Sequence, residues 1–178
     1  MNRKIFIIIT LACFNFIGFA QQKPDWQKWS WLVGEWQGEG SGQPGQGTGT
    51  FTFSFDLDSN ILVRKNHTEI PANQGNPKLI HDDLMIIYAD SEGNPGRAVY
   101  FDNEGHTIFY TISYSENAII LTSDKTDNMP IFRLTYNKID DEKTNIQFAM
   151  SKDGSVFINY LEGKSIRVKK ADQRQHEE

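Results

Sequence analysis

The sequence predicts an all-β protein, a single antiparallel up-and-down β-barrel of about nine to ten strands. Short segments with alternating apolar and polar residues recur through the chain, and 12% of the residues are aromatic. Turns rich in Gly, Asn and Asp separate them, and no long helical segment interrupts the series. A sheet of this size must curl, close or split, and closure removes its edges. A two-sheet sandwich is the alternative, although its longest candidate connection, 71–81, is short for a Greek key.

Residues 1–20 are expected to be a secretory signal peptide. Arg3 and Lys4 precede an apolar run, 5–19, that ends at the small residue Ala20. Cleavage near Ala20 would export the protein to the periplasm or the medium. Lipidation at Cys13 is the alternative, but the apolar run continues beyond this cysteine, where a polar tether would be expected.

The expected mature chain comprises one barrel domain, 21–168, and a polar disordered tail, 169–178. Removal of Arg3 and Lys4 from the 18 basic residues leaves 16 against 23 acidic ones, a formal net charge of −7. Without a basic patch, nucleic acid is not an expected partner. Without cysteine, disulfides and thiolate chemistry are excluded from the mature chain, and no segment in it is expected to span a membrane.

The elements follow in order from these patterns. One helical turn is expected at 26–30, just before the first strand. Asp58-Ser59-Asn60 and Asn103-Glu104-Gly105 mark turns between strands. The expected strands are 34–40, 51–57, 61–69, 84–88, 98–102, 106–114, 118–123, 131–136, 146–150 and 156–168, the last with a kink at Gly163.

The most informative segment runs from Trp31 to Gly40, with the sequence Trp-Leu-Val-Gly-Glu-Trp-Gln-Gly-Glu-Gly. Residues spaced by two lie on one face of a strand, so Gly34 and Gly38 share a face with Trp36. Glycines let neighbouring side chains approach the strand backbone closely. Trp36 is a large apolar side chain with one N–H donor, well suited to filling one end of a barrel.

This segment resembles the first strand of the calycins, the group that contains lipocalins, fatty-acid-binding proteins and nitrobindin-like barrels. The resemblance is closer to uncharacterised bacterial lipocalin-like proteins, because 34–40 is followed by the Phe-rich segment 51–55 and by Arg-Lys-Asn-His at 64–67. It implies that Trp36 closes the barrel and that a basic residue of the last strand, here Arg167, lies across its ring. Such a cation–π contact contributes about 0.5–2 kcal/mol.

No cofactor is expected. Nitrobindin-like barrels bind haem through a histidine on a late strand, but no histidine lies between His106 and His176 in this sequence. Asn159 and Tyr160 occupy the corresponding region. A tyrosine is a possible axial ligand, but the missing histidine disfavours haem.

Several polar side chains lie within otherwise apolar strands. If they point inward, they would hold an acidic or carbonyl head group of a small hydrophobic ligand, as in other small barrels. The sequence does not determine which of these side chains point inward, since a shift of the strand register by one residue exchanges the two faces. The first hypothesis is therefore an exported carrier or sensor, in preference to an enzyme. The candidate ligand-binding residues are Arg64, His81, Tyr100, His106 and Tyr110.

Two other functions are considered. One is a hydrolase or isomerase in which His67, His81 or His106 acts as a general base beside a carboxylate. The other is a packed barrel that serves as an interaction module in an envelope assembly. A metal site would need the pair His67 and Glu69 to meet the pair His81 and Asp83. No metal is predicted, because 81–83 is expected to open a strand in solvent and His106 to follow a hairpin turn, and both are ordinary exposed settings.

Overall fold

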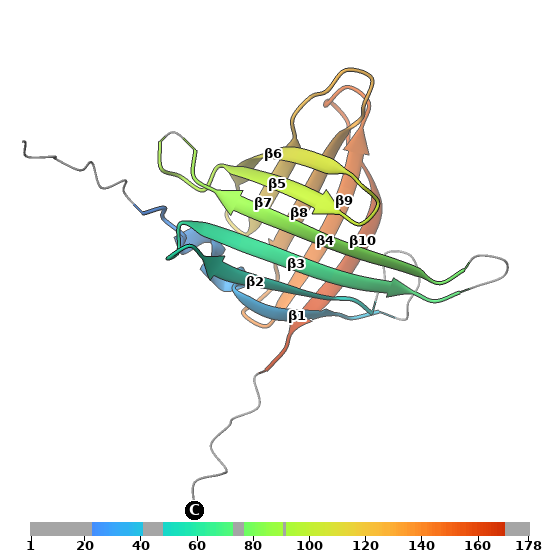
Figure 1. Ribbon diagram of the computed structural model, residues 1–178, viewed down its shortest axis with the longest axis horizontal. Helices are drawn as coiled ribbons and strands as arrows, with labels where there is room; N and C mark the ends of the chain where they lie inside the picture. Colours follow the sequence, from blue (N-terminus) through green and yellow to red (C-terminus); the bar gives the residue numbers. More distant parts are fainter. Residues whose placement is uncertain (1–22, 41–47, 73–76, 91, 170–178) are drawn as a thin grey trace, which may run out of the picture.

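The computed structural model describes residues 23–40, 48–72, 77–90 and 92–169, and in these residues ten antiparallel strands form one closed barrel (Figure 1). Each strand pairs with its neighbours in sequence, and β1 pairs with β10 to complete the ring. A 3-10 helix, η1 (Gln27–Leu32), precedes the strands. The strands are β1 (Gly34–Gly38), β2 (Thr50–Asp56), β3 (Ile61–Ile70), β4 (Leu79–Tyr88), β5 (Arg97–Asp102), β6 (Thr107–Tyr114), β7 (Ala118–Ser123), β8 (Ile131–Lys138), β9 (Lys143–Ser151) and β10 (Ile158–Arg167).

The predicted up-and-down barrel is confirmed, and the helical turn lies close to its predicted position. The predicted leader, 1–20, and all but the first residue of the predicted tail, 169–178, lie outside the described residues. Among the residues that the structure describes, no helix is long and apolar enough to cross a bilayer.

Two strand predictions need correction. β4 begins at Leu79, well before the predicted start at 84, because it pairs with β3 as far as Ile70. The alternative to a metal site, that 81–83 opens a strand in solvent, is wrong for His81 and Asp83, because the register places both on the inner face. β10 runs without interruption through Gly163, and its irregularity is a β-bulge between Asn159 and Leu161.

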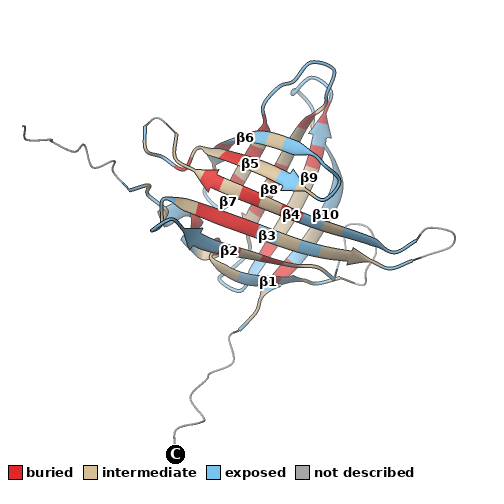
Figure 2. Ribbon diagram, viewed as in Figure 1, coloured by how far each residue is buried: buried red, intermediate tan, exposed pale blue. Residues whose placement is uncertain are grey.

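The strand register identifies the inner face. Leu62, Ile87, Ala98 and Tyr110 are cross-strand partners on β3 to β6, and each is almost fully buried. Because cross-strand partners lie on the same face of a sheet, this row marks the inside of the barrel. In β3 the buried segment, 62–64, lies toward the beginning of the strand (Figure 2).

Aromatic residues fill the end of the barrel that lies next to η1, which we call the closed end. Trp36 stacks on Phe51 with ring centres 6.1 Å apart and planes at 7°. Trp29 packs on Phe53 at 5.9 Å, and Leu32 of η1 is fully buried with them. The helix thus covers this end, and each aromatic pair adds about 0.5–1.5 kcal/mol beyond the burial of its surface.

Arg167 of β10 joins the last strand to the beginning of the chain at this end. Its guanidinium carbon lies 4.3 Å from the centre of the Trp36 ring, and the two residues are register partners. Its Nη1 donates to the Val33 carbonyl at 2.8 Å, its Nη2 donates to the Trp31 carbonyl, and its Nε donates to the Asp141 carbonyl at 3.0 Å. A Cβ at Gly34, whose φ is +127°, would lie 2.9 Å from Nη1. Only glycine therefore leaves room for this arginine.

The opposite end carries the turns 103–106, 124–130 and 152–157, and we call it the open end. Inward-facing apolar residues are exposed there. Met150 is the register partner of both Phe132 and Ile158, yet 44% of Met150 and 69% of Ile158 remain accessible. The inner wall is thus in contact with solvent on the side of β8 to β10.

Candidate functional site

A buried ion pair lies on the inner face of β3 and β4. Arg64 donates from Nη1 to Oδ1 of Asp83, and only 9% and 4% of the two side chains are exposed. Arg64 belongs to the row directly next to the buried row of Leu62, and its register partners Met85 and Tyr100 also point inward. Asp83 lies one row closer to the open end, paired with Asp102. Two charges out of water are costly unless they neutralise each other, so each requires the other.

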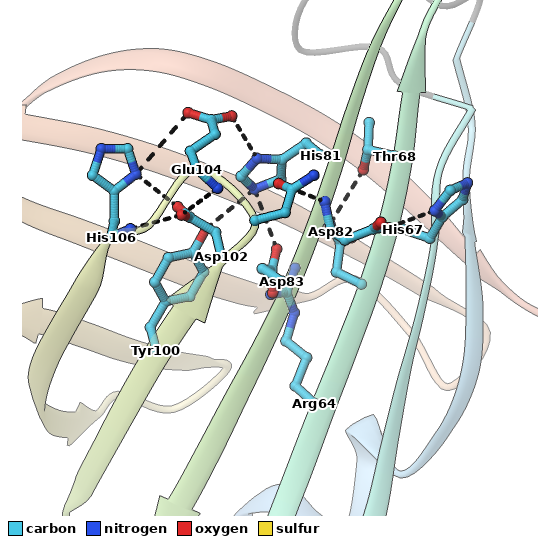
Figure 3. Close-up of polar contacts among 12 residues, drawn as sticks. Arg64, His67, Thr68, His81, Asp82, Asp83, Tyr100, Asp102, Glu104 and His106 are labelled. Atoms are coloured by element: carbon cyan, nitrogen blue, oxygen red, sulfur yellow. Dashed lines mark hydrogen bonds and ion pairs between the residues drawn. The ribbon is translucent and has the colours of Figure 1, made fainter.

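A chain of polar contacts leads from Asp83 to the open end (Figure 3). His81 Nε2 lies 3.5 Å from Asp83 Oδ2 and 3.1 Å from the Tyr100 hydroxyl. The Tyr100 hydroxyl donates to Asp102 Oδ2 at 3.1 Å. The chain therefore links β4 and β5 across the inner face.

The turn between β5 and β6 completes this network. Asp102, whose side chain is 4% exposed, accepts from the main-chain N–H groups of Glu104 and His106 and lies 2.8 Å from Nδ1 of the His106 ring. Glu104 reaches back to His81 Nδ1 at 3.1 Å. Asp102 thus orders the turn, and the turn supplies a second carboxylate to His81.

The charges of this network fix its protonation states. The hydrogen bond to Asp83, assisted by Glu104, outweighs burial and raises the pKa of His81 to about 9. The His81 ring is therefore a cation at neutral pH and donates from both nitrogens. Burial raises the pKa values of Tyr100 and Tyr110 well above the usual range, so both phenols remain protonated.

Tyr136 of β8 lies fully buried opposite the ion pair. Burial raises its pKa to about 12, although the positive charge of Arg64 acts in the other direction. Arg64 and Tyr136 flank the same ring: the guanidinium carbon is 5.7 Å from the Phe51 ring centre and the Tyr136 ring centre is 6.3 Å from it. In the described part of the chain, no hydrogen bond of normal geometry reaches the buried Tyr136 hydroxyl or Arg64 Nε, although Arg64 lies close enough to Tyr136 to act on its pKa.

Toward the open end, the inner wall of β8 to β10 is apolar. Phe132 and Phe148 stack with ring centres 5.7 Å apart, and Tyr160 meets Phe148 edge-on at 5.1 Å. Tyr160 remains 53% exposed although its ring lies against this inward-facing pair. The inner face therefore has a polar, charged half on β3 to β6 and an aromatic half on β8 to β10.

The structure places the five candidate ligand-binding residues in two different environments. Arg64, His81, Tyr100 and Tyr110 point inward, whereas His106 lies at the rim with 58% of its side chain exposed. Tyr136 was not among the candidates, although its alternation with Leu134 in β8 is the signal for an inward position.

His67 lies on the outer face of the barrel. It contacts Asp82 at 2.6 Å and Glu69 at 3.5 Å, and half of its side chain is exposed. His81 and Asp83 lie on the inner face, so the two pairs that a metal site would need are on opposite sides of the wall. Within the described ranges, no group of three or more His, Cys, Asp or Glu side chains is placed to hold a metal ion.

Arg133 likewise belongs to the outside. Its guanidinium carbon lies 3.5 Å from the centre of the Phe157 ring, under the turn between β9 and β10. Its register partner Ala149 faces the same way. This arginine is therefore not part of the inner polar network.

Together these features define a ten-stranded antiparallel barrel with one aromatic closed end and an amphipathic inner wall within the described residues. The chain is similar to the crystal structure of Rv2717c from M. tuberculosis, with 16% sequence identity and a TM-score of 0.53 over 81% of this chain and 97% of that chain. At this identity the similarity shows the fold alone. Neither a protein-family model nor a curated protein sequence matches the chain.

Proposed function

We propose that the barrel binds a small, largely apolar molecule against its inner wall near the open end. The observation that carries this proposal is the exposure of inward-facing apolar side chains on β9 and β10, Met150 and Ile158 among them. Binding sites for small molecules combine a mostly apolar wall with a few placed polar groups. Covering such a wall yields about 25 cal/mol for each Å² of apolar surface removed from water.

The polar end of the ligand lies among the inward side chains of β3 to β6. Arg64 and Tyr110 lie deepest, and His81 and Tyr100 lie between them and the rim. His106 belongs to the turn at the entrance. These five residues are the proposed polar contacts.

Export is part of the same proposal. A calycin-like protein with a leader at 1–20, cleaved near Ala20, would act as a periplasmic or secreted carrier or sensor. Expression of the full chain in a Gram-negative host, followed by N-terminal sequencing of the periplasmic fraction, tests this step. We expect the sequence to begin at Gln21, and a protein retained in the cytoplasm with Met1 would contradict it.

The binding proposal is tested with a neutral fluorescent probe, N-phenyl-1-naphthylamine, and with native mass spectrometry of protein purified from its host. We expect one-to-one binding with increased fluorescence. Met150→Lys puts a charge on the inner wall and should abolish binding. Met129→Lys is the matched control, because Met129 is also exposed, 54% against 44% for Met150, but belongs to the turn between β7 and β8. Equal binding by both variants would place the probe elsewhere.

A second candidate function is acid–base catalysis at the rim. Its support is the convergence of His81 and His106 on Glu104, at 3.1 Å and 4.0 Å. His81 is protonated at neutral pH and would serve as an acid. Turnover of a neutral aryl ester that is lost in His106→Gln but retained in His67→Gln would favour this function over binding alone.

A further inference from the structure

We propose that the polar group of the ligand is an uncharged hydrogen-bond acceptor, such as a ketone, ester or amide carbonyl, that accepts hydrogen bonds from the Tyr136 hydroxyl and from Nε of Arg64. This inference rests on the proposed function and specifies the class of ligand that the inner wall selects. A free carboxylate, the other head group that an inward-facing arginine would suggest, is not expected to bind here.

The first argument is the balance of charge. The inner network contains two cations, Arg64 and His81, and two buried carboxylates, Asp83 and Asp102, with the rim carboxylate Glu104 beside His81. Arg64 is already neutralised by Asp83, and His81 lies between Asp83 and Glu104. An anionic ligand would therefore meet no unpaired cation and would face two fixed carboxylates, while losing its own hydration.

The second argument is the inventory of hydrogen bonds. Buried polar atoms normally have partners, and leaving one without a partner costs about 1–3 kcal/mol. In the described residues the Tyr136 hydroxyl and Arg64 Nε are two such atoms. Arginine only donates, so a ligand group that satisfies Nε must accept, and the protonated Tyr136 hydroxyl can donate to the same group.

The two donors belong to side chains that lie beside the same aromatic ring. Both residues flank the Phe51 ring, Arg64 from β3 and Tyr136 from β8, so they approach from opposite walls of the barrel. Neighbouring side chains shield both atoms from solvent. The proposal therefore requires one of these side chains to change its rotamer when the ligand binds.

The apolar body of the ligand then lies along the aromatic half of the wall. Phe148 lies one inward row closer to the open end than Ile146, the register partner of Tyr136, and Tyr160 packs on Phe148. A carbonyl near one end of an aliphatic or aromatic body matches this arrangement. A molecule with charge at its inner end does not.

The test compares three ligands of similar length by isothermal titration at pH 7.5: 2-undecanone, decanoate and undecane, all below their aggregation concentrations. We expect the ketone to bind at least about tenfold more tightly than either of the others. Decanoate binding as tightly as the ketone would overturn the charge argument. Undecane binding as tightly as the ketone would overturn the hydrogen-bond argument. If none binds and the neutral probe fails too, the proposed function itself is wrong.

Tyr136→Phe removes one donor and keeps the ring. We expect it to weaken ketone binding about five- to tenfold and to leave undecane binding unchanged. Tyr114→Phe is the matched control, since the Tyr114 hydroxyl bonds to Trp29 and Pro95 at the closed end. Equal ketone affinity of Tyr136→Phe and the wild type would overturn the proposed contact.

A second pair of variants tests the charge balance. Asp83→Asn leaves Arg64 unpaired and should raise the affinity for decanoate relative to the ketone by about tenfold or more. Asp82→Asn, the same change on the outer face, should leave the ratio unchanged. Should Asp83→Asn fail to fold, the ligand comparison and Tyr136→Phe still decide the question. An unchanged ratio in folded Asp83→Asn would overturn the inference.

Discussion

The guanidinium of Arg167 lies 4.3 Å from the centre of the Trp36 ring and donates to main-chain carbonyls at Trp31, Val33 and Asp141. One side chain of the last strand thus contacts the first strand, the end of η1 and the turn between β8 and β9. Its planar group with five donors suits this arrangement, which a single ammonium does not reproduce.

Arg167→Lys is expected to lower the free energy of unfolding by about 2–3 kcal/mol, because several carbonyl acceptors lose their donor. Urea denaturation measures the change. Arg97→Lys on the outer face, where the arginine pairs with Asp124, is the control and should cost less than about 1 kcal/mol. Equal losses in both variants would show that the closing role of Arg167 is wrong.

Trp36→Ala is expected to destabilise the barrel by about 3–5 kcal/mol, the usual range for removing a fully buried tryptophan. The variant loses the stack on Phe51 and the contact with Arg167. Urea denaturation gives the magnitude. A variant with unchanged stability would contradict the role of Trp36 in closing the barrel.

Gly34→Ala should cost about 2 kcal/mol or more, because the φ of +127° is strained for alanine and the new Cβ would lie 2.9 Å from Arg167 Nη1. Gly105→Ala distinguishes the effect of the strained φ from the effect of the short contact with Arg167. Gly105 also has a positive φ, +92°, but nothing lies within 4 Å of a Cβ there. A smaller loss for Gly105→Ala than for Gly34→Ala, measured by thermal unfolding, would assign the difference to the arginine contact.

Tyr136→Phe should leave stability unchanged or raise it by about 1 kcal/mol, because it removes a buried hydroxyl that has no partner among the described residues. Tyr114→Phe should lower stability by about 1–2 kcal/mol, since its hydroxyl accepts from Trp29 and donates to the Pro95 carbonyl. Differential scanning calorimetry compares the two. A clear loss in Tyr136→Phe would mean that its hydroxyl is satisfied in solution.

His81 should make stability depend on pH between about 6.5 and 9. Its pKa rises from 6.5 to about 9 on folding, so its contribution is fully present below pH 6.5 and is lost as the pH rises through 9. The full contribution is at most about 3 kcal/mol, because the ring is partly exposed and solvent screens its interaction with the carboxylates. Urea denaturation across this range should show a decline that His81→Gln flattens. The same slope in both proteins would mean that His81 is not stabilised as a cation.

The alternation of apolar and polar residues and the turn signals predicted the number and direction of the strands well. Which alternate side chains of the polar strands face the inside of the barrel was not predictable, because the pattern in 61–69 fits either face. Pairing across three strands fixes it, by aligning Arg64 with Met85 and Tyr100. Such long-range register does not appear in any local segment of sequence.

The candidate site was predictable only in part for the same reason. Asp83 looked like a residue of a solvent-exposed strand opening, since charged residues are rarely buried without a partner. That partner, Arg64, lies on the neighbouring strand. Tyr136 was overlooked because its significance comes from the side chains opposite it in the closed barrel and not from its neighbours in β8.

The pairing of β1 with β10 also determines when the barrel can close during synthesis of the chain. The ring joins residues near 36 to residues near 167, so the sheet cannot close until the last strand has been synthesised. Until then β1 and β9 both present unpaired edges, which favour association with other chains. Contacts this distant in sequence also slow folding. The ten residues of β10 therefore determine when the growing chain stops being prone to aggregation.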